Sequence, residues 1–180
     1  MLRVLAIIGL FLFMLVGCSK DSTQPDEASC PEGTVKWTNG HCYEAVLALG
    51  LSWEQARDSC VARGGHLVTI TSAEENAFVF SLVSSDSAFW FLDAFANGLG
   101  PWLGGYQPDG IEEPDSGWQW VTGEPFIYTN WETGQPGDLG NMDQNRLRFF
   151  KAGGLIGDRW DDCEPNNPLE HRRGYIFEHD

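Results

Sequence analysis

A long polar segment between two aromatic strand candidates is the feature that most constrains how this chain can fold. The segment runs from 118 to 162, and its middle is rich in Gly, Pro, Asn and Asp. It begins with the aromatic run Trp118–Val121 and ends in Trp160 followed by Asp161 and Asp162. A loop this long inside a compact domain is either disordered or functional. Carboxylate and amide oxygens at its two ends are hard ligands of the kind that calcium takes, about six to eight at a time. The sequence therefore places its candidate site here.

The charge of the chain excludes one class of partner. The 180 residues carry a formal net charge of −15 and suffice for one domain with a modest core. Binding to nucleic-acid phosphates needs basic patches, so nucleic acid is not an expected partner. Most of the acidic residues are expected to lie on a solvated face, and a few are candidates for holding a divalent cation.

Residues 1–17 are predicted to be a lipoprotein signal peptide and not part of the fold. Arg3 precedes an apolar run, Val4–Val16, whose length is typical of a signal-peptide core and too short for a membrane span. The following Gly17-Cys18 completes a sequence that resembles a bacterial lipoprotein cleavage box, in which the thiol of Cys18 receives a diacylglyceryl group. Firm anchoring needs the two or three acyl chains that this modification supplies, because one chain binds only marginally. The alternative is an ordinary cleaved signal peptide with Cys18 incidental.

Residues 18–29 are predicted to be a lipid-anchored, flexible tether. They are polar, contain one proline and show no periodicity. Ser19 follows Cys18 where Asp could stand, and resemblance to the Gram-negative sorting rule then implies the outer membrane. The expected location is therefore the cell envelope of a bacterium, with the protein exported and held to the membrane by its N-terminal lipid.

Four further cysteines would be oxidised in such a compartment, where disulfides persist. Cys30 and Cys42 flank a hairpin-like segment with an Asn-Gly turn signal at 39–40. A bridge between them would close a short loop, which usually stabilises a fold by about 2–4 kcal/mol. Cys60 and Cys163 either pair with each other or stay free, and an exported chain favours the pairing.

Two capping boxes predict helices in the first half of the chain. Ser52-Trp-Glu-Gln55 opens a helix that the glycines at 64–65 end, and Ser72-Ala-Glu-Glu75 opens a helix through about Val83. Trp53, Phe78 and Phe80 are expected in the core. Short strands are expected at 66–70, 102–106, 118–121, 147–150, 159–160 and 175–178, while 84–100 fits either a strand or a short helix. Helices gathered early and strands gathered late suggest an α+β fold with antiparallel pairing.

These pieces, in this order, resemble a C-type lectin-like domain, and the resemblance spans 30–180. The motifs that carry it are Cys30 with Cys42-Tyr, Ser52-Trp, Cys60, Gly64-Gly-His-Leu, Ser72-Ala-Glu-Glu-Asn76, Trp102-Leu-Gly-Gly, Trp118 with Trp120-Val-Thr-Gly-Glu-Pro, Thr129-Asn-Trp131, Trp160-Asp-Asp and Gly174-Tyr-Ile-Phe-Glu178. The resemblance implies paired N- and C-terminal strands, two helices flanking small antiparallel sheets, and a long loop that carries the ligand site.

In sugar-binding members of that family, calcium lies beside a cis-proline tripeptide, a following acidic residue, and an Asn-Asp pair after the late Trp. Position by position, the resemblance implies a calcium set of Gln135, Asp143 (or Gln144 in the neighbouring register), Asp161 and Asp162. It implies sugar contacts from Gln135, Gly137, Asp138, Asp143 and Asp161. Carbonyl and carboxylate oxygens with waters make a calcium cage, and two neighbouring sugar hydroxyls can replace two of those waters.

This sequence departs from the family pattern at several positions. Gly137 stands where the family has Asn or Asp, so only Asp138, one position later, could supply a side-chain oxygen. Gln135 in place of Glu is a feature of galactose-type sites. Two other tripeptides, at 107–109 and 164–166, spell the family's sugar motifs but do not follow Trp131, and we interpret them as proline turns. The residue that pairs with Cys60 in the family falls at Phe177. Each of the two disulfides usual in the family therefore has only one of its two cysteines in this chain.

Three functions can be compared on this basis. The first is a surface-anchored module that binds glycans or glycoconjugates with calcium, and the alternative is a calcium-independent domain that binds a protein or another surface through the same loop. Gly137, and Met142 where an acid is expected, favour the alternative. An enzyme is not predicted, because the histidines at 41, 66, 171 and 179 sit in no pairing with a nucleophile. The adjacent Asp161 and Asp162 are also not the opposed carboxylates that glycoside cleavage needs.

Overall fold

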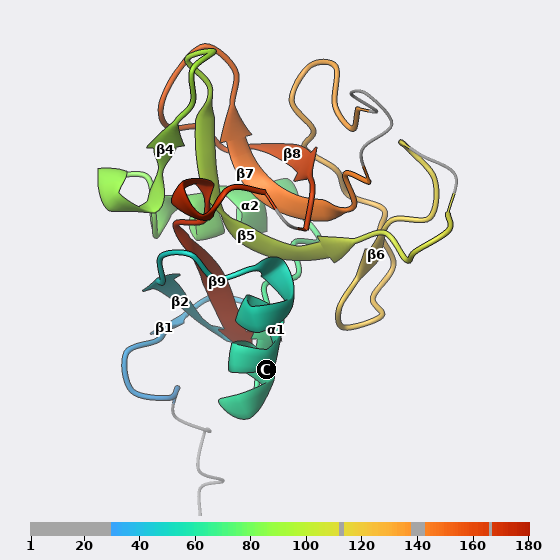
Figure 1. The fold of residues 1–180 in the computed structure, drawn as a ribbon. Coiled ribbons are helices and arrows are strands. Elements are labelled where there is room, and N and C mark those ends of the chain that lie inside the picture. Colours follow the sequence, from blue (N-terminus) through green and yellow to red (C-terminus); the bar gives the residue numbers. More distant parts are fainter. Residues whose placement is uncertain (1–29, 112–113, 138–142, 166) are drawn as a thin grey trace, which may run out of the picture.

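A computed structural model describes residues 30–111, 114–137, 143–165 and 167–180. This part of the chain forms two helices and a sheet whose strands follow the order β1-β2-β9-β5-β7-β8, with β3 on β9 and with β4 and β6 on β5 (Figure 1). The predicted signal peptide, the tether and Cys18 lie outside the described residues. No helix of the described chain is both long and apolar enough to cross a bilayer.

The elements are short, and most of the strands lie in the second half of the chain. The strands are β1 Val35–Lys36, β2 Cys42–Leu47, β3 His66–Leu67, β4 Phe91–Leu92, β5 Gly98–Tyr106, β6 Gln119–Trp120, β7 Arg146–Lys151, β8 Arg159–Cys163 and β9 Gly174–His179. The helices are α1 Trp53–Ala62 and α2 Ala73–Ser81, with 3-10 turns at Ser87–Phe89 and Leu169–His171. The segment 84–100, for which the sequence fitted either a strand or a short helix, therefore holds a 3-10 turn, then β4, and then the first residues of β5.

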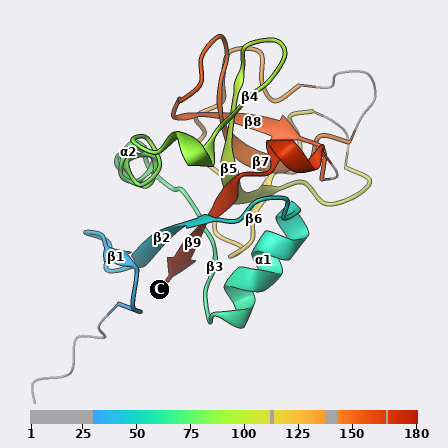
Figure 2. The ribbon, with the colours of Figure 1, turned by 60° about the vertical axis from the view of Figure 1, so that its left-hand side comes forward.

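The terminal strands pair as the resemblance implies. β2 runs antiparallel to β9 from Cys42 opposite His179 to Leu47 opposite Gly174. β5 meets β9 in parallel at Trp102 and Tyr175, which joins the antiparallel groups into one sheet. Figure 2 shows α1 and α2 on either side of the β2–β9 pair. The α+β, C-type lectin-like architecture is confirmed, whereas separate small sheets are not observed because this parallel contact links them.

Both predicted capping boxes begin helices, but only the first is complete. The Ser52 hydroxyl accepts from the Gln55 N–H at 3.2 Å, and the Gln55 side chain accepts from the Ser52 N–H at 2.9 Å. At the second helix Ser72 accepts from the Glu75 N–H, but the Glu75 carboxylate accepts from the Thr71 N–H at 2.7 Å. This helix ends at Ser81, two residues earlier than expected.

The interior consists of two apolar clusters. The larger cluster contains Trp120, Phe149 and Trp160, and the predicted core residues Phe78 and Phe80 are only partly buried against it. The smaller cluster contains Trp53, Cys60, Leu67, Trp102, Cys163, Tyr175 and Phe177. It joins α1 to the sheet where β5 and β9 touch.

The cysteines behave in two ways. Cys30 and Cys42 form the predicted disulfide, with their Cα atoms 5.6 Å apart. The predicted pairing of Cys60 with Cys163 is wrong, because both are free thiols. Cys60 faces the smaller cluster from α1, while the Cys163 thiol, on β8, lies 3.6 Å from the Arg146 carbonyl oxygen and donates to it. Each acts as a small apolar group in the core.

The free thiols give a direct test of this packing. Burial raises the pKa of both Cys60 and Cys163 to about 12, so neither forms a reactive thiolate at ordinary pH. We expect a maleimide reagent to leave both unmodified in the native protein and to modify both in concentrated urea without reductant, as read by peptide mass spectrometry. Urea-unfolded protein that needs reductant before these two cysteines react would instead indicate a disulfide between them.

Candidate functional site

Trp160 of β8 holds the long loop against the sheet. Its indole N–H donates to the Asn76 side-chain oxygen of α2 at 2.8 Å. Its backbone N–H donates to the Asn130 carbonyl, and its own carbonyl accepts from the Glu132 N–H, both at 2.9 Å. The ring of Trp131 packs edge-on against Trp160 with centroids 6.0 Å apart. The loop therefore runs beside β8 immediately before the proline tripeptide.

The two ends of the predicted site meet at Asp162. The bond between Gln135 and Pro136 is cis. The backbone N–H of Gly137 donates to both carboxylate oxygens of Asp162 at 3.0 Å, and Asp162 is fully buried. The oxygens near Gln135 and those beyond Trp160 thus converge, and Asp162 is used to fasten the loop.

Asp161 is occupied by a cation that the chain itself supplies. Arg148 lies directly opposite Asp161 in the antiparallel pairing of β7 with β8. Its Nε and Nη2 donate to the Asp161 Oδ2 at 3.0 and 2.6 Å. The two residues are only 8% and 4% exposed, so this is a buried ion pair. The role of Arg148 was missed at the sequence level, because it follows from strand register and not from any motif.

Burial and charge act against each other in this pair. Burial raises the pKa of Asp161, and the neighbouring Arg148 guanidinium opposes that rise. Burial also disfavours a charged Arg148, but nearby acidic groups, Asp161 among them, raise its pKa overall. We assign both groups as charged at neutral pH, because the 2.6 Å contact between Arg148 Nη2 and Asp161 Oδ2 is as short as charge-assisted hydrogen bonds are.

A cavity of about 440 Å³ opens beside this pair. Its lining comprises amide, acidic, basic and apolar side chains: Asp93, Phe95, Asn97, Leu99, Gln135, Gln144, Arg148, Phe150, Asp161, Glu164 and His171. Arg148 Nη1 is buried and has no hydrogen-bond partner among the described residues. A buried donor without a partner is costly, so this N–H group is suited to donate a hydrogen bond to a ligand oxygen.

The structure separates the predicted site residues into three groups. Gln135 and Asp161 line the cavity, and Gln144 lines it in place of Asp143, which is exposed. Gly137 contributes only its backbone N–H, and Asp138 lies outside the described residues. Glu164 also faces the cavity, although we interpreted its tripeptide as a simple turn. A residue after β8 reaches the site because the chain turns back there toward β9.

His171 and the acids set the charge of the cavity. The His171 ring lies 4.7 Å from the ring of Phe91. Burial and the Arg148 charge lower the pKa of His171, so its ring is neutral at pH 7. Asp93, Asp161 and Glu164 then outnumber the single guanidinium.

This donor set does not fit a calcium ion. One Asp161 oxygen is bound by the guanidinium, and both Asp162 oxygens accept from Gly137, which has no side-chain oxygen of its own. Calcium needs about six to eight oxygens, with carboxylates among them, and the charge of Arg148 would repel it. The predicted set of Gln135, Asp143, Asp161 and Asp162 is therefore not assembled as a cage.

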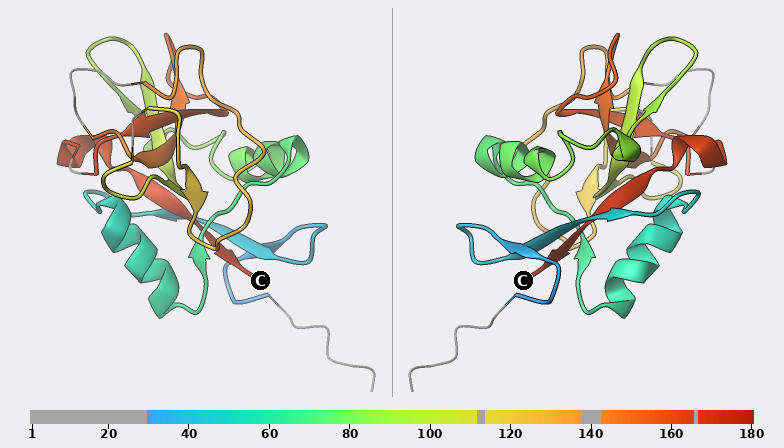
Figure 3. Two further views of the ribbon diagram at one scale, coloured as in Figure 1. Left: turned by 90° about the vertical axis from the view of Figure 1, so that its right-hand side faces the viewer. Right: turned by 90° about the vertical axis from the view of Figure 1, so that its left-hand side faces the viewer.

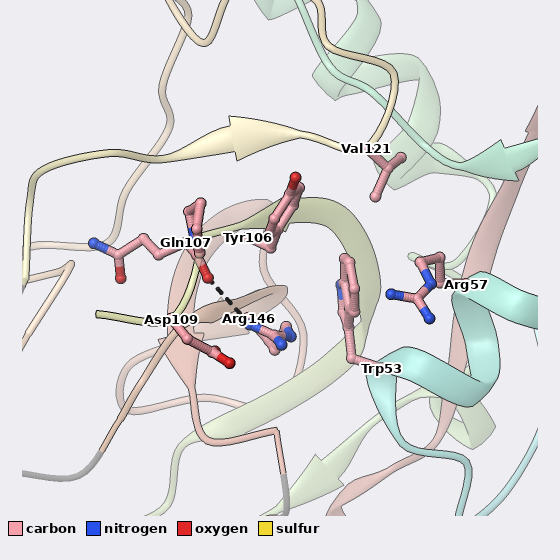
Figure 4. A pocket seen from close by; sticks show the side chains of 8 residues that line it. Trp53, Arg57, Tyr106, Gln107, Asp109, Val121 and Arg146 are labelled. Carbon is pink, nitrogen blue, oxygen red and sulfur yellow. Dashed lines mark hydrogen bonds between the residues drawn. The ribbon is translucent and has the colours of Figure 1, made fainter. Parts of the chain in front are cut away.

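A second cavity, of about 300 Å³, lies between α1 and the end of β5 (Figure 4). Arg146 covers the Trp53 ring at 4.9 Å, and its Nε donates to Glu54 at 2.9 Å. Its Nη1 donates to the Gln107 carbonyl at 3.3 Å, and the Gln107 side chain donates to the Ser116 carbonyl at 2.6 Å. Arg146 and the Gln107 amide nitrogen thus bond to neighbouring protein groups, although the buried Gln107 Oε1 has no partner among the described residues. We assign this cavity, with the tripeptide at 107–109, a structural role.

Known proteins share this fold and this sequence pattern. Residues 50–146 match the Lectin C-type domain family. A perlucin-like protein of Mytilus galloprovincialis is 31% identical over 176 residues, covering 97% of each chain. The chain belongs to the C-type lectin domain family. Members of this family are typically binding modules, and carbohydrate-binding domains are among them.

Other similar proteins include two from mammals. Regenerating islet-derived protein 3-gamma of Rattus norvegicus is 30% identical over 147 residues, covering 81% of this chain and 77% of that one. The structure of human lithostathine matches with a TM-score of 0.64 at 24% identity, over 89% of this chain and 99% of that one. The structure of a calcium-independent type II antifreeze protein matches with a TM-score of 0.58 at 22% identity, over 84% of this chain and 94% of that one. These relatives do not support the bacterial lipoprotein form that the N-terminus suggests.

Removing the guanidinium tests the buried pair. Arg148→Met should lower the free energy of unfolding by about 3–5 kcal/mol, because it leaves Asp161 buried without a partner. Arg148→Met combined with Asp161→Leu should recover most of that loss. Urea unfolding of both single variants and the double variant measures the coupling.

Arg57→Met is the matched control for this cycle. Arg57 pairs with the adjacent exposed Asp58 and lies partly exposed over the Trp53 ring at the rim of the second cavity, so this change should cost less than about 1 kcal/mol. Additive effects of the two changes at 148 and 161 would contradict the pairing.

Proposed function

We propose that this domain binds neutral carbohydrate without calcium, in the cavity beside Arg148. The observation that carries the proposal is that Arg148 lines the cavity while its buried Nη1 has no hydrogen-bond partner among the described residues. Its guanidinium stands among the side chains expected to ligate calcium. A fixed positive charge there can hold a sugar oxygen directly, so no metal ion is needed to bridge protein and ligand.

The mixture of side chains around the cavity suits a sugar. The amides of Gln135 and Gln144 can donate and accept, and the carboxylates of Asp93 and Glu164 can accept from hydroxyls. Phe95 is 85% exposed at the rim and offers an aromatic face to the apolar side of a sugar ring. A few placed polar groups in a partly apolar hollow are typical of small-ligand sites.

The charge of the cavity favours a neutral sugar. Asp93, Asp161 and Glu164 oppose one guanidinium, so a sugar carboxylate or sulfate would meet a net negative surface. Hydroxyl and acetamido oxygens can accept from Arg148 without that repulsion. The fold is compatible with a domain that does not need calcium, because a calcium-independent type II antifreeze protein shares it.

Binding in the presence of a chelator is the decisive test. We expect the same glycans to be retained on an array with calcium and with EDTA. We also expect equal melting temperatures in both buffers, because calcium would raise the melting temperature only if it bound the native protein. Arg148→Lys should weaken retention about tenfold or more, since an ammonium cannot hold Asp161 and a ligand oxygen in the same fork geometry. Arg57→Lys, at the exposed α1 site, should leave retention unchanged, and loss of binding in EDTA would contradict the proposal.

A calcium-independent domain that binds a protein surface is the second candidate. Phe95, which lines the cavity, is 85% exposed, and Leu92 of β4 is 50% exposed, and such apolar side chains also suit a protein partner. A blank glycan array, together with a protein partner whose binding is lost in Phe95→Ser, would favour this candidate over carbohydrate.

We also propose that the chain is exported and anchored through lipid on Cys18. The support is sequence alone, namely the apolar run followed by Gly17-Cys18. On expression in a Gram-negative host, the wild type should fractionate with membranes and Cys18→Ser with the soluble fraction. Intact mass of the purified wild type should show the added acyl groups, and a soluble, unmodified wild-type protein would contradict the anchor.

A further inference from the structure

A cluster of metal-ligating side chains lies far from the cavity, where the C-terminal strand ends. His41 precedes β2, and Glu178 and Asp180 lie at the end of β9. Each offers one ligand atom, and these atoms all lie within 4.8 Å of one another. Figure 3 shows the C-terminal end beside the β1–β2 hairpin, and Figure 1 places it at the opposite end of the domain from β4 and β8.

The spacing of the ligand atoms suits a small tetrahedral ion. His41 Nδ1 lies 2.7 Å from Glu178 Oε1 and 3.5 Å from Asp180 Oδ1. A tetrahedral zinc ion about 2.0–2.1 Å from nitrogen and oxygen ligands separates them by about 3.3–3.4 Å. These two separations lie on either side of that value, and the third, between the Glu178 and Asp180 oxygens, is within 4.8 Å. Rotation of the His41 and Asp180 side chains, which are 35% and 69% exposed, would bring the three atoms to tetrahedral spacing.

Neighbouring groups already orient two of the three ligands. Glu178 is 2% exposed, and its Oε2 accepts from the Thr69 N–H at 2.9 Å, which leaves Oε1 toward His41. Asp180 Oδ1 lies 3.1 Å from His66 Nε2, and His66 Nδ1 lies 2.9 Å from the Leu67 carbonyl oxygen. The Thr69 contact holds Glu178 from behind, whereas His66 contacts the same Asp180 oxygen that faces His41. Hydrogen bonds of this kind orient carboxylate ligands in metal sites.

We propose that His41, Glu178 and Asp180 bind a zinc-class divalent ion, with a water as the fourth ligand. An imidazole nitrogen among the ligands favours zinc over calcium, which takes oxygens. The two carboxylates balance the charge of the ion. The ion ties the turn before β2 to the end of β9, where the terminal strands pair.

Calorimetric titration of the tag-free, metal-free protein with zinc sulfate tests this site. We expect about one zinc ion per chain, and we expect His41→Gln and Asp180→Asn each to weaken binding about tenfold or more. His179→Gln is the matched control, because His179 lies between two of the ligands but faces the other side of β9, and it should bind zinc as the wild type does. Calcium chloride should give no heat at this site.

A second readout separates metal binding from a merely structural role of these residues. The zinc-induced rise in melting temperature should be present in the wild type and His179→Gln, and absent in His41→Gln, whatever the metal-free melting temperature of each variant. Zinc binding that His41→Gln leaves unchanged, or the absence of zinc binding to the wild type, would overturn the site. Either result would leave the carbohydrate proposal untouched, because the two sites share no residue.

Discussion

The packing of Trp160 is the interaction on which the arrangement of the site depends. Its fully buried indole lies within reach of Trp120, Tyr128 and Trp131, and its N–H reaches Asn76 on α2. Each such aromatic pair stabilises a fold by about 0.5–1.5 kcal/mol beyond its buried area. One side chain therefore joins helix, sheet and loop, and its packing fixes the position of the two aspartates that follow it.

The pair that follows Trp160 illustrates how one fold can exchange a metal for a side chain. Asp161 and Asp162 occupy the positions at which sugar-binding family members have calcium ligands. In this chain Arg148 binds the first, and the Gly137 N–H donates to the second. A buried carboxylate needs a compensating charge, and either a cation from solvent or a guanidinium can supply it. In this chain the guanidinium is covalently part of the neighbouring strand, so the compensation is permanent.

Much of the architecture was predictable from local pattern. The capping serines at 52 and 72 mark both helices, and the cysteines at 30 and 42 form the expected bridge. The site was less predictable, because its chemistry depends on which residues face one another. Asp143 and Gln144 differ by one position, and only the folded course of the chain before β7 decides which of them lines the cavity. The pairing of Cys60 with Cys163 failed for the same reason, since shared burial in one core cluster does not make two thiols bond partners.

The sequence by itself determined the family, the order of the helices and strands outside 84–100, and the place of the polar loop between its aromatic anchors. Those features arise from contacts close in the chain or from residue types that suit few environments, such as capping serines and buried tryptophans. Only the tertiary structure decided that Arg148 lies opposite Asp161, and that His41 lies beside Glu178, 137 positions away. Such pairs are created by strand register, which is set by the packing of the whole domain and leaves no mark in any short stretch of sequence.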